Sequence, residues 1–219
     1  MNTLTEKQTL RYDLLKANSY DVKNAKACYE FVADNEQTQQ ANNGLTDGIY
    51  LMQDGGGAVL FTGQAINENE KSRCVGIGVK LASKSLVVSL REATDEDTEL
   101  TTKAGGSRFI TQYHEAVEDW AGKENTADMR EILRDNIKLE DGEYIPSLGQ
   151  MYFILLHFRA INAAIEAVGG ETLRDDWYWT STECSATYAW YLYLNDGTAG
   201  NTTKAAYQRR VRPVSAFLL

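Results

Sequence analysis

The stretch of sequence that determines the fold lies near the C-terminal end and covers residues 177–217. It reads WYWTSTECSATYAWYLYLNDGTAGNTTKAAYQRRVRPVSAF. Apolar and polar side chains alternate along 189–195, and successive side chains of a β-strand point to opposite faces of its sheet. One face is therefore expected to be a core face, with Trp190, Leu192 and Leu194. The opposite face is expected to be displayed, with Tyr191, Tyr193 and Asn195.

The displayed face has the composition of a binding surface. Tyr and Trp provide a large contact area at a low cost in conformational entropy, and Ser and Asn provide adaptable hydrogen bonds. A single Tyr in a strand is explained at least as well by β-propensity and cross-strand packing. The clustering of these residue types within 177–217 favours binding for the set as a whole.

A helix is predicted upstream of this stretch, over 147–168. Ser147 follows a proline and stands three residues before Gln150, which is the spacing of a capping box. Apolar residues continue at three- and four-residue steps, and the pattern allows a break near His157. Gly169 and the glycine after it supply the left-handed backbone expected at the end of a helix.

Earlier in the chain, four short β-prone runs are separated by Gly, Asn and Asp. They lie at 48–53, 57–63, 73–81 and 85–90, and they predict an antiparallel sheet. The glycines at 55–57 lack the Lys-Ser/Thr and the helix of a phosphate-binding loop, so a hairpin is predicted there. Helical spacing returns over 107–120 and 126–137, and these two helices are expected to lie on the sheet.

The first 45 residues differ from the rest of the chain in their sequence pattern. Apolar residues recur at helical steps between 5 and 35, which predicts two helices, and the polar run 34–43 indicates a linker or loop. The chain is therefore divided into a helical N-terminal segment, 1–45, and a ligand-binding domain, 46–219.

Composition and charge restrict the function classes. The chain has 219 residues and a formal net charge of -9, which opposes the attraction to phosphate that nucleic-acid binding needs. No apolar run approaches the ~20 residues of a membrane span. The first 20 residues contain charges throughout, so no signal peptide is visible.

The thiols and imidazoles of the chain do not suggest a metal centre. Cys28, Cys74 and Cys184 lack C-x-x-C spacing, so no zinc site or redox pair is predicted. His114 and His157 are the two histidines, and neither has a partner at metal-binding spacing. We expect no cofactor and no metal.

A series of motifs resembles the C-terminal part of a known family. The motifs are IPSLGQ (145–150), INAAIEAVGG (161–170), YWTSTE (178–183), AWYLYL (189–194), an Asn-Asp-Gly turn (195–197) and RRVRPVSAF (209–217). They resemble C-type-lectin-fold proteins, a family that includes the variable proteins of diversity-generating retroelements and overlaps with the formylglycine-generating-enzyme-like fold. The resemblance covers about 45–219 and is strongest from Tyr144 onward.

The resemblance implies an α+β, C-type-lectin-like fold with a small twisted antiparallel sheet flanked by two helices, preceded here by a short helical segment. By analogy, the scaffold positions are Trp177, Trp179, Trp190, Gly197, Arg212 and Pro213. The variable, ligand-binding positions are Tyr178, Cys184, Ser185, Thr187, Tyr188, Tyr191, Tyr193, Asn195 and Asn201.

Two features of the same region have alternative interpretations. Asn195 and Asp196 are similar to the Asn-Asp pair of a calcium-dependent lectin, but Asn/Asp-Gly is also the strongest hairpin signal, and the other calcium-ligating motifs are absent. The arginines of RRVR suit a phosphate or carboxylate ligand, or structural pairing with Asp175, Asp176 or Glu183.

We expect a receptor-binding protein and not an enzyme. Its partner is predicted to be a protein or glycan on a host or partner cell surface, and its location a virion tail or bacterial surface, with a homo-oligomer as one option. The alternative is a structural subunit of a phage tail or surface appendage. A formylglycine-generating-type enzyme needs a second cysteine close to Cys184.

Overall fold

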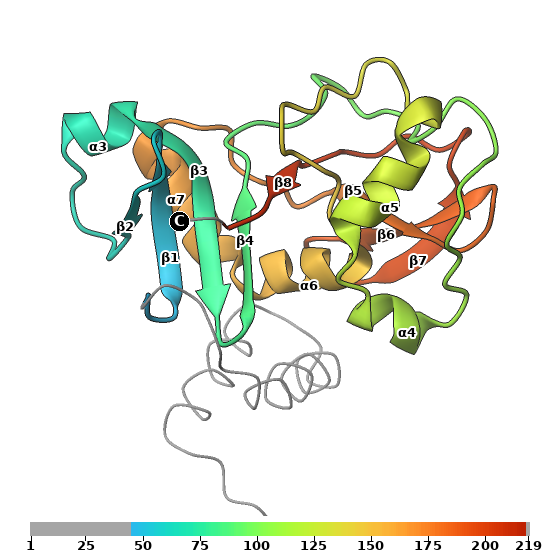
Figure 1. Cartoon of the computed structure of the whole chain (residues 1–219), viewed down its shortest axis with the longest axis horizontal. Coiled ribbons are helices and arrows are strands. Elements are labelled where there is room, and N and C mark those ends of the chain that lie inside the picture. The colour runs from blue at the N-terminus through green and yellow to red at the C-terminus, as the bar shows by residue number, and fades with distance from the viewer. Residues whose placement is uncertain (1–44, 218–219) are drawn as a thin grey trace, which may run out of the picture.

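The computed structural model describes residues 45–217, and it contains two antiparallel sheets connected by helices (Figure 1). The predicted helical segment 1–45, with Cys28, therefore lies outside the described residues except for Leu45. The fold is α+β, as expected. A single small sheet was expected, whereas the described chain builds one five-stranded and one three-stranded sheet.

The five-stranded sheet has the order β2-β1-β3-β4-β8. Its strands are Ala58–Leu60 (β2), Gly48–Gln53 (β1), Cys74–Leu81 (β3), Lys84–Val88 (β4) and Val214–Ser215 (β8). The predicted antiparallel sheet over 48–90 is confirmed, and the last strand comes from the C-terminal end of the chain. The glycine hairpin between β1 and β2 is confirmed too, with Gly55 and Gly56 in left-handed backbone at φ 81° and 91°.

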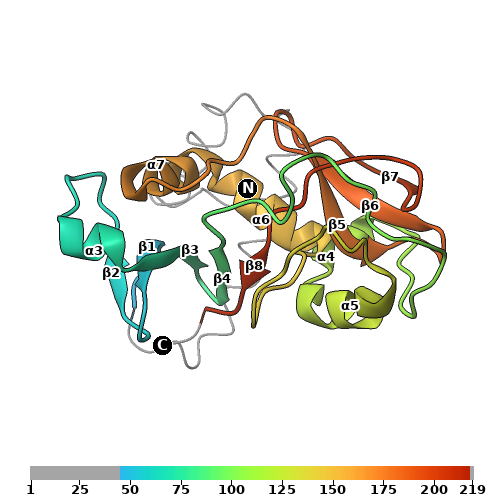
Figure 2. The same ribbon diagram turned by 90° about the horizontal axis from the view of Figure 1, so that it is seen from above.

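The three-stranded sheet has the order β5-β6-β7. Its strands are Trp177–Glu183 (β5), Tyr188–Tyr193 (β6) and Ala199–Thr203 (β7). Figure 2 shows that the two sheets lie at opposite ends of the described chain. The regular hydrogen-bonding pattern between β5 and β6 is interrupted once, between Trp179 and Glu183, where the register shifts.

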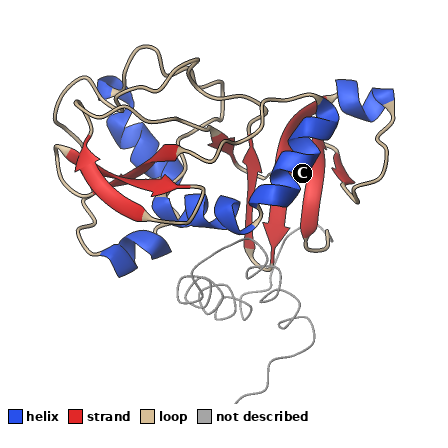
Figure 3. Cartoon of the chain, turned by 180° about the vertical axis from the view of Figure 1, so that it is seen from behind, coloured by secondary structure: helices blue, strands red, loops and turns tan. Residues whose placement is uncertain are grey.

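A bent helix pair connects the cores of the two sheets. Helix α6, Leu148–Leu156, contacts β5 and β6, whereas helix α7, Phe158–Val168, contacts β1 and β3 (Figure 3). The predicted capping box of Ser147 and Gln150, the break at His157 and the left-handed Gly169 are all confirmed. Among the described residues no single helix is long and apolar enough to cross a membrane, although α6 and α7 pass that test as a pair bent by 77°.

The remaining helices are short: α3 was not predicted, and the two helices predicted over 107–120 and 126–137 are shorter than expected. Helix α3, Glu68–Ser72, precedes β3; helix α4 covers only Tyr113–Glu118 of the predicted 107–120. Helix α5, Gly122–Met129, is followed by a single 3-10 turn, Arg130–Ile132 (η2), in place of a helix over 126–137. The expectation that both would lie on the 48–90 sheet is wrong, because α4 packs on α6 and α5 on β5.

The reason for the shortening is tertiary hydrogen bonding. Residues before α4 run beside the end of β5, where Ile110 N donates to Glu183 O and Gly105 N donates to Ala186 O. Backbone groups that bond to a neighbouring strand are not available for a helix. Helical spacing alone carries no information about that competition.

Strand β5 lies between two hydrophobic cores. Tyr178 belongs to the larger core, with Leu192 of β6 and side chains of α6 and α7, whereas Trp179 belongs to a second core that includes Leu100 and Val211. Both rings are fully buried. Tyr178 therefore has no exposed surface, which contradicts the prediction that it is a variable surface position.

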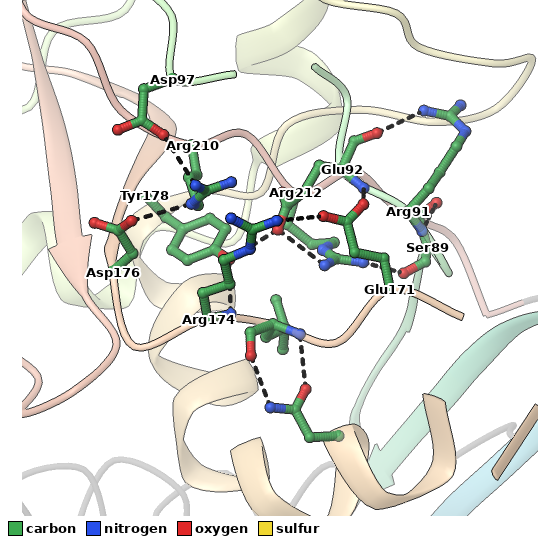
Figure 4. A network of polar contacts seen from close by, with 12 residues as sticks. Ser89, Arg91, Glu92, Asp97, Glu171, Arg174, Asp176, Tyr178, Arg210 and Arg212 are labelled. Carbon is green, nitrogen blue, oxygen red and sulfur yellow. Dashed lines mark hydrogen bonds and ion pairs between the residues drawn. The ribbon is translucent and has the colours of Figure 1, made fainter. Parts of the chain in front are cut away.

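A buried polar network ties β5 to the loops that flank β4 and β8 (Figure 4). Arg212 Nη2 donates to Glu92 Oε1 at 2.8 Å, and the Tyr178 hydroxyl donates to the same oxygen at 2.8 Å. Arg212 Nη1 also donates to Ser89 O at 3.0 Å. Arg212 is fully buried and Glu92 nearly so, which confirms the expectation that Arg212 belongs to the scaffold.

Replacing Tyr178 with Phe tests this network through the pH dependence of stability. Burial, with the nearby Glu92 carboxylate, raises the pKa of Tyr178 far above its ordinary value of 10.0. The stability from the neutral hydroxyl is therefore full below pH ~10 and falls as the pH rises further, by up to about 1.4 kcal/mol per pH unit, because only the unfolded chain ionises.

We expect Tyr178→Phe to lose about 1 kcal/mol at neutral pH with its hydrogen bonds and to show a shallower alkaline fall, measured by urea unfolding between pH ~8 and ~11. Tyr188→Phe, at an exposed tyrosine, should keep the wild-type slope. An unchanged slope in Tyr178→Phe would contradict the assignment.

Candidate functional site

The half-exposed end of the three-stranded sheet carries a group of aromatic side chains around one arginine. We call it the aromatic cluster, and it consists of Trp177, Tyr191, Tyr193, Tyr207 and Arg209. The register pairs Trp177 with Tyr193 and Trp179 with Tyr191, and paired residues share a face. Trp177, Trp179, Tyr191 and Tyr193 therefore lie on one face of the sheet. The second core covers this face over Trp179, whereas the end with Trp177 and Tyr193 remains partly exposed.

The rings of the aromatic cluster are packed against one another. Trp177 stacks on Tyr193 with centroids 4.4 Å apart and an interplanar angle of 15°, and it meets Tyr191 edge to face at 5.1 Å. Gly200 of β7 makes room for this arrangement, because a Cβ there would stand 2.5 Å from the Tyr191 hydroxyl. The sequence Ala-Gly-Asn in β7 thus decides where the Tyr191 ring lies.

Arg209 holds its guanidinium over these rings. Its Cζ lies 4.0 Å from the Tyr191 centroid, 5.2 Å from Trp177, 5.6 Å from Trp179 and 5.9 Å from Tyr207. Such contacts are cation–π interactions, in which the negative ring face attracts the cation. Arg209 Nε is buried and has no acceptor among residues 45–217.

The other two arginines of the RRVR run have structural partners. Arg210 pairs with Asp176 at 3.0 Å and with Asp97 at 3.5 Å, so the predicted pairing with Asp176 is confirmed. Arg212 pairs with Glu92 as described above. Arg209 forms no ion pair within the described part of the chain.

The predicted displayed residues do not form one patch. Tyr191 and Tyr193 lie in the aromatic cluster, as the alternation predicted, while Trp190, Leu192 and Leu194 are buried. Tyr188 and Asn201, however, lie on the face of Trp190, because the register pairs Asn201 with Trp190. Tyr188 escapes burial only because it is the first residue of β6, where it remains 42% exposed.

The turn between β5 and β6 holds three further predicted positions. Thr187 is exposed, and Cys184 and Ser185 are half-buried. Ser185 Oγ accepts hydrogen bonds from the backbone N–H groups of Thr187 and Tyr188, which orders the turn. Burial against the larger core raises the pKa of Cys184. Cys184 and Cys74 are both free thiols in the described chain.

The Asn-Asp-Gly motif forms the turn between β6 and β7. Asp196 Oδ1 accepts from Thr198 N at 2.8 Å, Gly197 adopts φ 79°, and Asn195 Nδ2 donates to the Tyr193 hydroxyl at 3.4 Å. The hairpin interpretation is confirmed. Residues 45–217 contain no group of three or more His, Cys, Asp or Glu side chains placed to hold a metal ion.

The expected scaffold positions differ in exposure. Trp179, Trp190, Gly197, Arg212 and Pro213 are all buried. Trp177 is only half-buried and takes part in the aromatic cluster. It was predicted to be scaffold, and the structure places it among the residues that a ligand can reach.

A buried ion pair that the sequence did not suggest supports the other end of this sheet. Lys204 Nζ contacts Glu183 Oε1 and donates to Gly105 O at 2.8 Å, with both charged side chains almost inaccessible to solvent. Burial raises the pKa of Glu183, although Lys204 opposes this shift. The predicted partner of Glu183 was an arginine, and neither residue type nor spacing indicated Lys204.

Comparison with known proteins gives one informative likeness. No family model matches the chain, and no curated protein matches it. Among solved structures, the chain is similar to a fimbrial protein from Bacteroides ovatus, with a TM-score of 0.57 and 16% sequence identity. The likeness covers 79% of this chain but only 49% of the fimbrial protein, so this chain corresponds to about half of that protein's length. At this identity it is a likeness of fold.

Two substitutions in β6 test the division between buried and displayed positions. Trp190 is buried and donates its indole N–H to Ile110 O at 2.8 Å. We expect Trp190→Ala to lower the free energy of unfolding by about 3–5 kcal/mol, and Tyr188→Ser, two residues earlier on the same face, to change it by no more than about 0.5 kcal/mol. Urea unfolding of both variants measures the difference, and equal losses would refute the division.

Proposed function

We propose that this chain is a subunit of a bacterial surface appendage and that it displays the aromatic cluster to a binding partner. The observation that carries the proposal is the half-exposed aromatic cluster on a sheet whose opposite face is packed on the larger core over Trp190 and Leu192. The fold likeness to a fimbrial protein supports the appendage context. A non-enzymatic role is part of the proposal, since Cys184 has no disulfide partner within residues 45–217.

The physical argument concerns preorganisation. Tyr191, Tyr193 and Trp177 are held by one another and by Arg209, so few rotamers remain to be ordered when a partner binds. Aromatic and arginine side chains are also those that contribute most to binding energy at interfaces. A filament that repeats such a face along its length gains from avidity, even where each site is weak.

Fractionation of cells that produce the protein tests this function. The full-length chain should be recovered with appendages sheared from the cell surface, and cells carrying Tyr193→Ser should adhere less to their partner surface while keeping the protein in the sheared fraction. Tyr188→Ser is the matched control, because it removes the same side chain from the other face and should leave adhesion unchanged.

Two results would count against the proposal. Recovery of the protein only from the cell interior would exclude an appendage subunit. Loss of the Tyr193→Ser protein from the sheared fraction would make the aromatic cluster an assembly contact between subunits and not a displayed binding face.

A second candidate is a diversified binder with a C-type-lectin-like fold, encoded beside a diversity-generating retroelement. The specific observation in its favour is the location of the proposed variable positions. Apart from Tyr178 they are at least partly exposed, while most proposed scaffold residues are buried. Substitutions at such positions change the surface and leave the packing intact.

Genome sequencing around the gene distinguishes this candidate. A reverse transcriptase and an imperfect repeat of the segment that encodes 177–212, differing at adenines, are the expected finding for a diversified binder. The changed codons should include those of Tyr188 and Asn201 and exclude that of Tyr178. Absence of the repeat from the complete locus would remove this candidate and leave the appendage subunit.

A further inference from the structure

The arginine of the aromatic cluster differs from its neighbours in how its charge is balanced. Arg210, the next residue, pairs with both Asp97 and Asp176. Arg209 pairs with no carboxylate among residues 45–217 and is held by ring faces instead. Arg209 Nε has no acceptor within residues 45–217, and the residue as a whole is only half-buried, so the accessible part of its side chain can meet an external anion.

Arg209 is also fixed in place. Its backbone N–H donates to Thr98 O at 2.9 Å, and Thr98 N donates back to Arg209 O at 2.9 Å. The indole N–H of the buried Trp179 donates to the same Thr98 oxygen at 2.8 Å. These bonds anchor the Arg209 backbone to the second core, and the ring contacts restrict the guanidinium, so a ligand has less side-chain freedom to remove on binding.

We infer that the aromatic cluster binds an acidic sugar, with the sugar carboxylate on Arg209 and the sugar ring against Trp177 and Tyr193. The inference rests on the proposed function, because it names the chemistry of the partner that the displayed face recognises. Arginine pairs with carboxylates in a charge-assisted, often bidentate geometry. Aromatic faces are electron-rich and attract the partly positive C–H groups that cover one side of a sugar ring.

The limited exposure of the rings in the cluster favours a sugar over a protein surface. A stable protein interface buries about 800 Å² on each partner and contains an apolar centre. Here the rings of Trp177, Tyr191 and Tyr193 are each partly buried, and Tyr207 is the one ring that is more than half exposed, at 54%. One cation beside a small stacked pair fits a ligand with one negative charge and one ring.

The experiment is an NMR titration of the isotope-labelled full-length chain at low ionic strength. The probes are glucuronic acid, the uncharged methyl glucoside and acetate, and the signals followed are the Trp177 indole N–H and the Arg209 backbone N–H. We expect glucuronate to bind in the millimolar range and to be at least about tenfold tighter than either methyl glucoside or acetate, because each of these lacks one half of the recognition.

Two variants at Arg209 identify the anchoring group. Arg209→Gln should weaken glucuronate binding about tenfold, and Arg209→Lys should fall between it and the wild type, because an ammonium keeps the charge but loses the planar fork. Arg73→Gln is the control, since Arg73 is an exposed arginine beside the other sheet and pairs with Asp54. It should bind glucuronate as the wild type does. Unchanged amide spectra away from the cluster establish that each variant is folded.

Each alternative outcome overturns a stated part of the inference. Equal affinities for glucuronate and methyl glucoside, or an unchanged affinity in Arg209→Gln, would exclude Arg209 as the carboxylate anchor. Equal affinities for glucuronate and acetate would exclude recognition of the sugar ring. Tighter binding of an aspartate-rich peptide than of glucuronate would make the ligand a protein carboxylate. None of these results affects recovery of the protein with sheared appendages, so failure here is distinct from failure of the proposed function.

Discussion

A carboxylate and a guanidinium, those of Glu92 and Arg212, meet in the interior of this protein at 2.8 Å. Neither charge can be buried alone without a cost of several kcal/mol, so the segments that carry them have to come together. Glu92 follows β4, Arg212 precedes β8, and the Tyr178 hydroxyl donates a second hydrogen bond to Glu92 from β5. The pair thereby joins the five-stranded sheet to the three-stranded sheet.

The helices α6 and α7 also connect the two sheets. Because the chain bends by 77° at His157, α6 packs on the three-stranded sheet and α7 on the five-stranded one. Apolar side chains from both helices and both sheets form one continuous core, while a second core covers the far side of β5. This burial on both sides fixes β5 in place, and with it the register of β6 and the position of every side chain that β6 displays.

The aromatic cluster is a consequence of where the second core ends. Over Trp179 the face of the sheet is covered, whereas over Trp177, Tyr191 and Tyr193 nothing in the described chain covers it completely. Arg209 fills part of this opening and is held there by the Thr98 backbone. A face with a cation on electron-rich rings results, and the same packing that stabilises the fold holds the aromatic cluster in this arrangement.

Local patterns in the sequence determined much of this architecture. Period-two alternation identified the buried and displayed residues of β6, the capping box and the glycine stop placed α6 and α7, and the Asn-Asp-Gly motif placed the hairpin at 195–197. These features depend on neighbours in the chain, and for that reason they can be read without the fold. The tertiary structure alone decided that Tyr178 is buried and that 107–112 runs beside β5 instead of joining a helix. It also paired Asp97 and Asp176 with Arg210, while Arg209 has no ion pair within residues 45–217. Burial and charge pairing depend on which segments meet in space, and the sequence pattern of one segment does not contain that information.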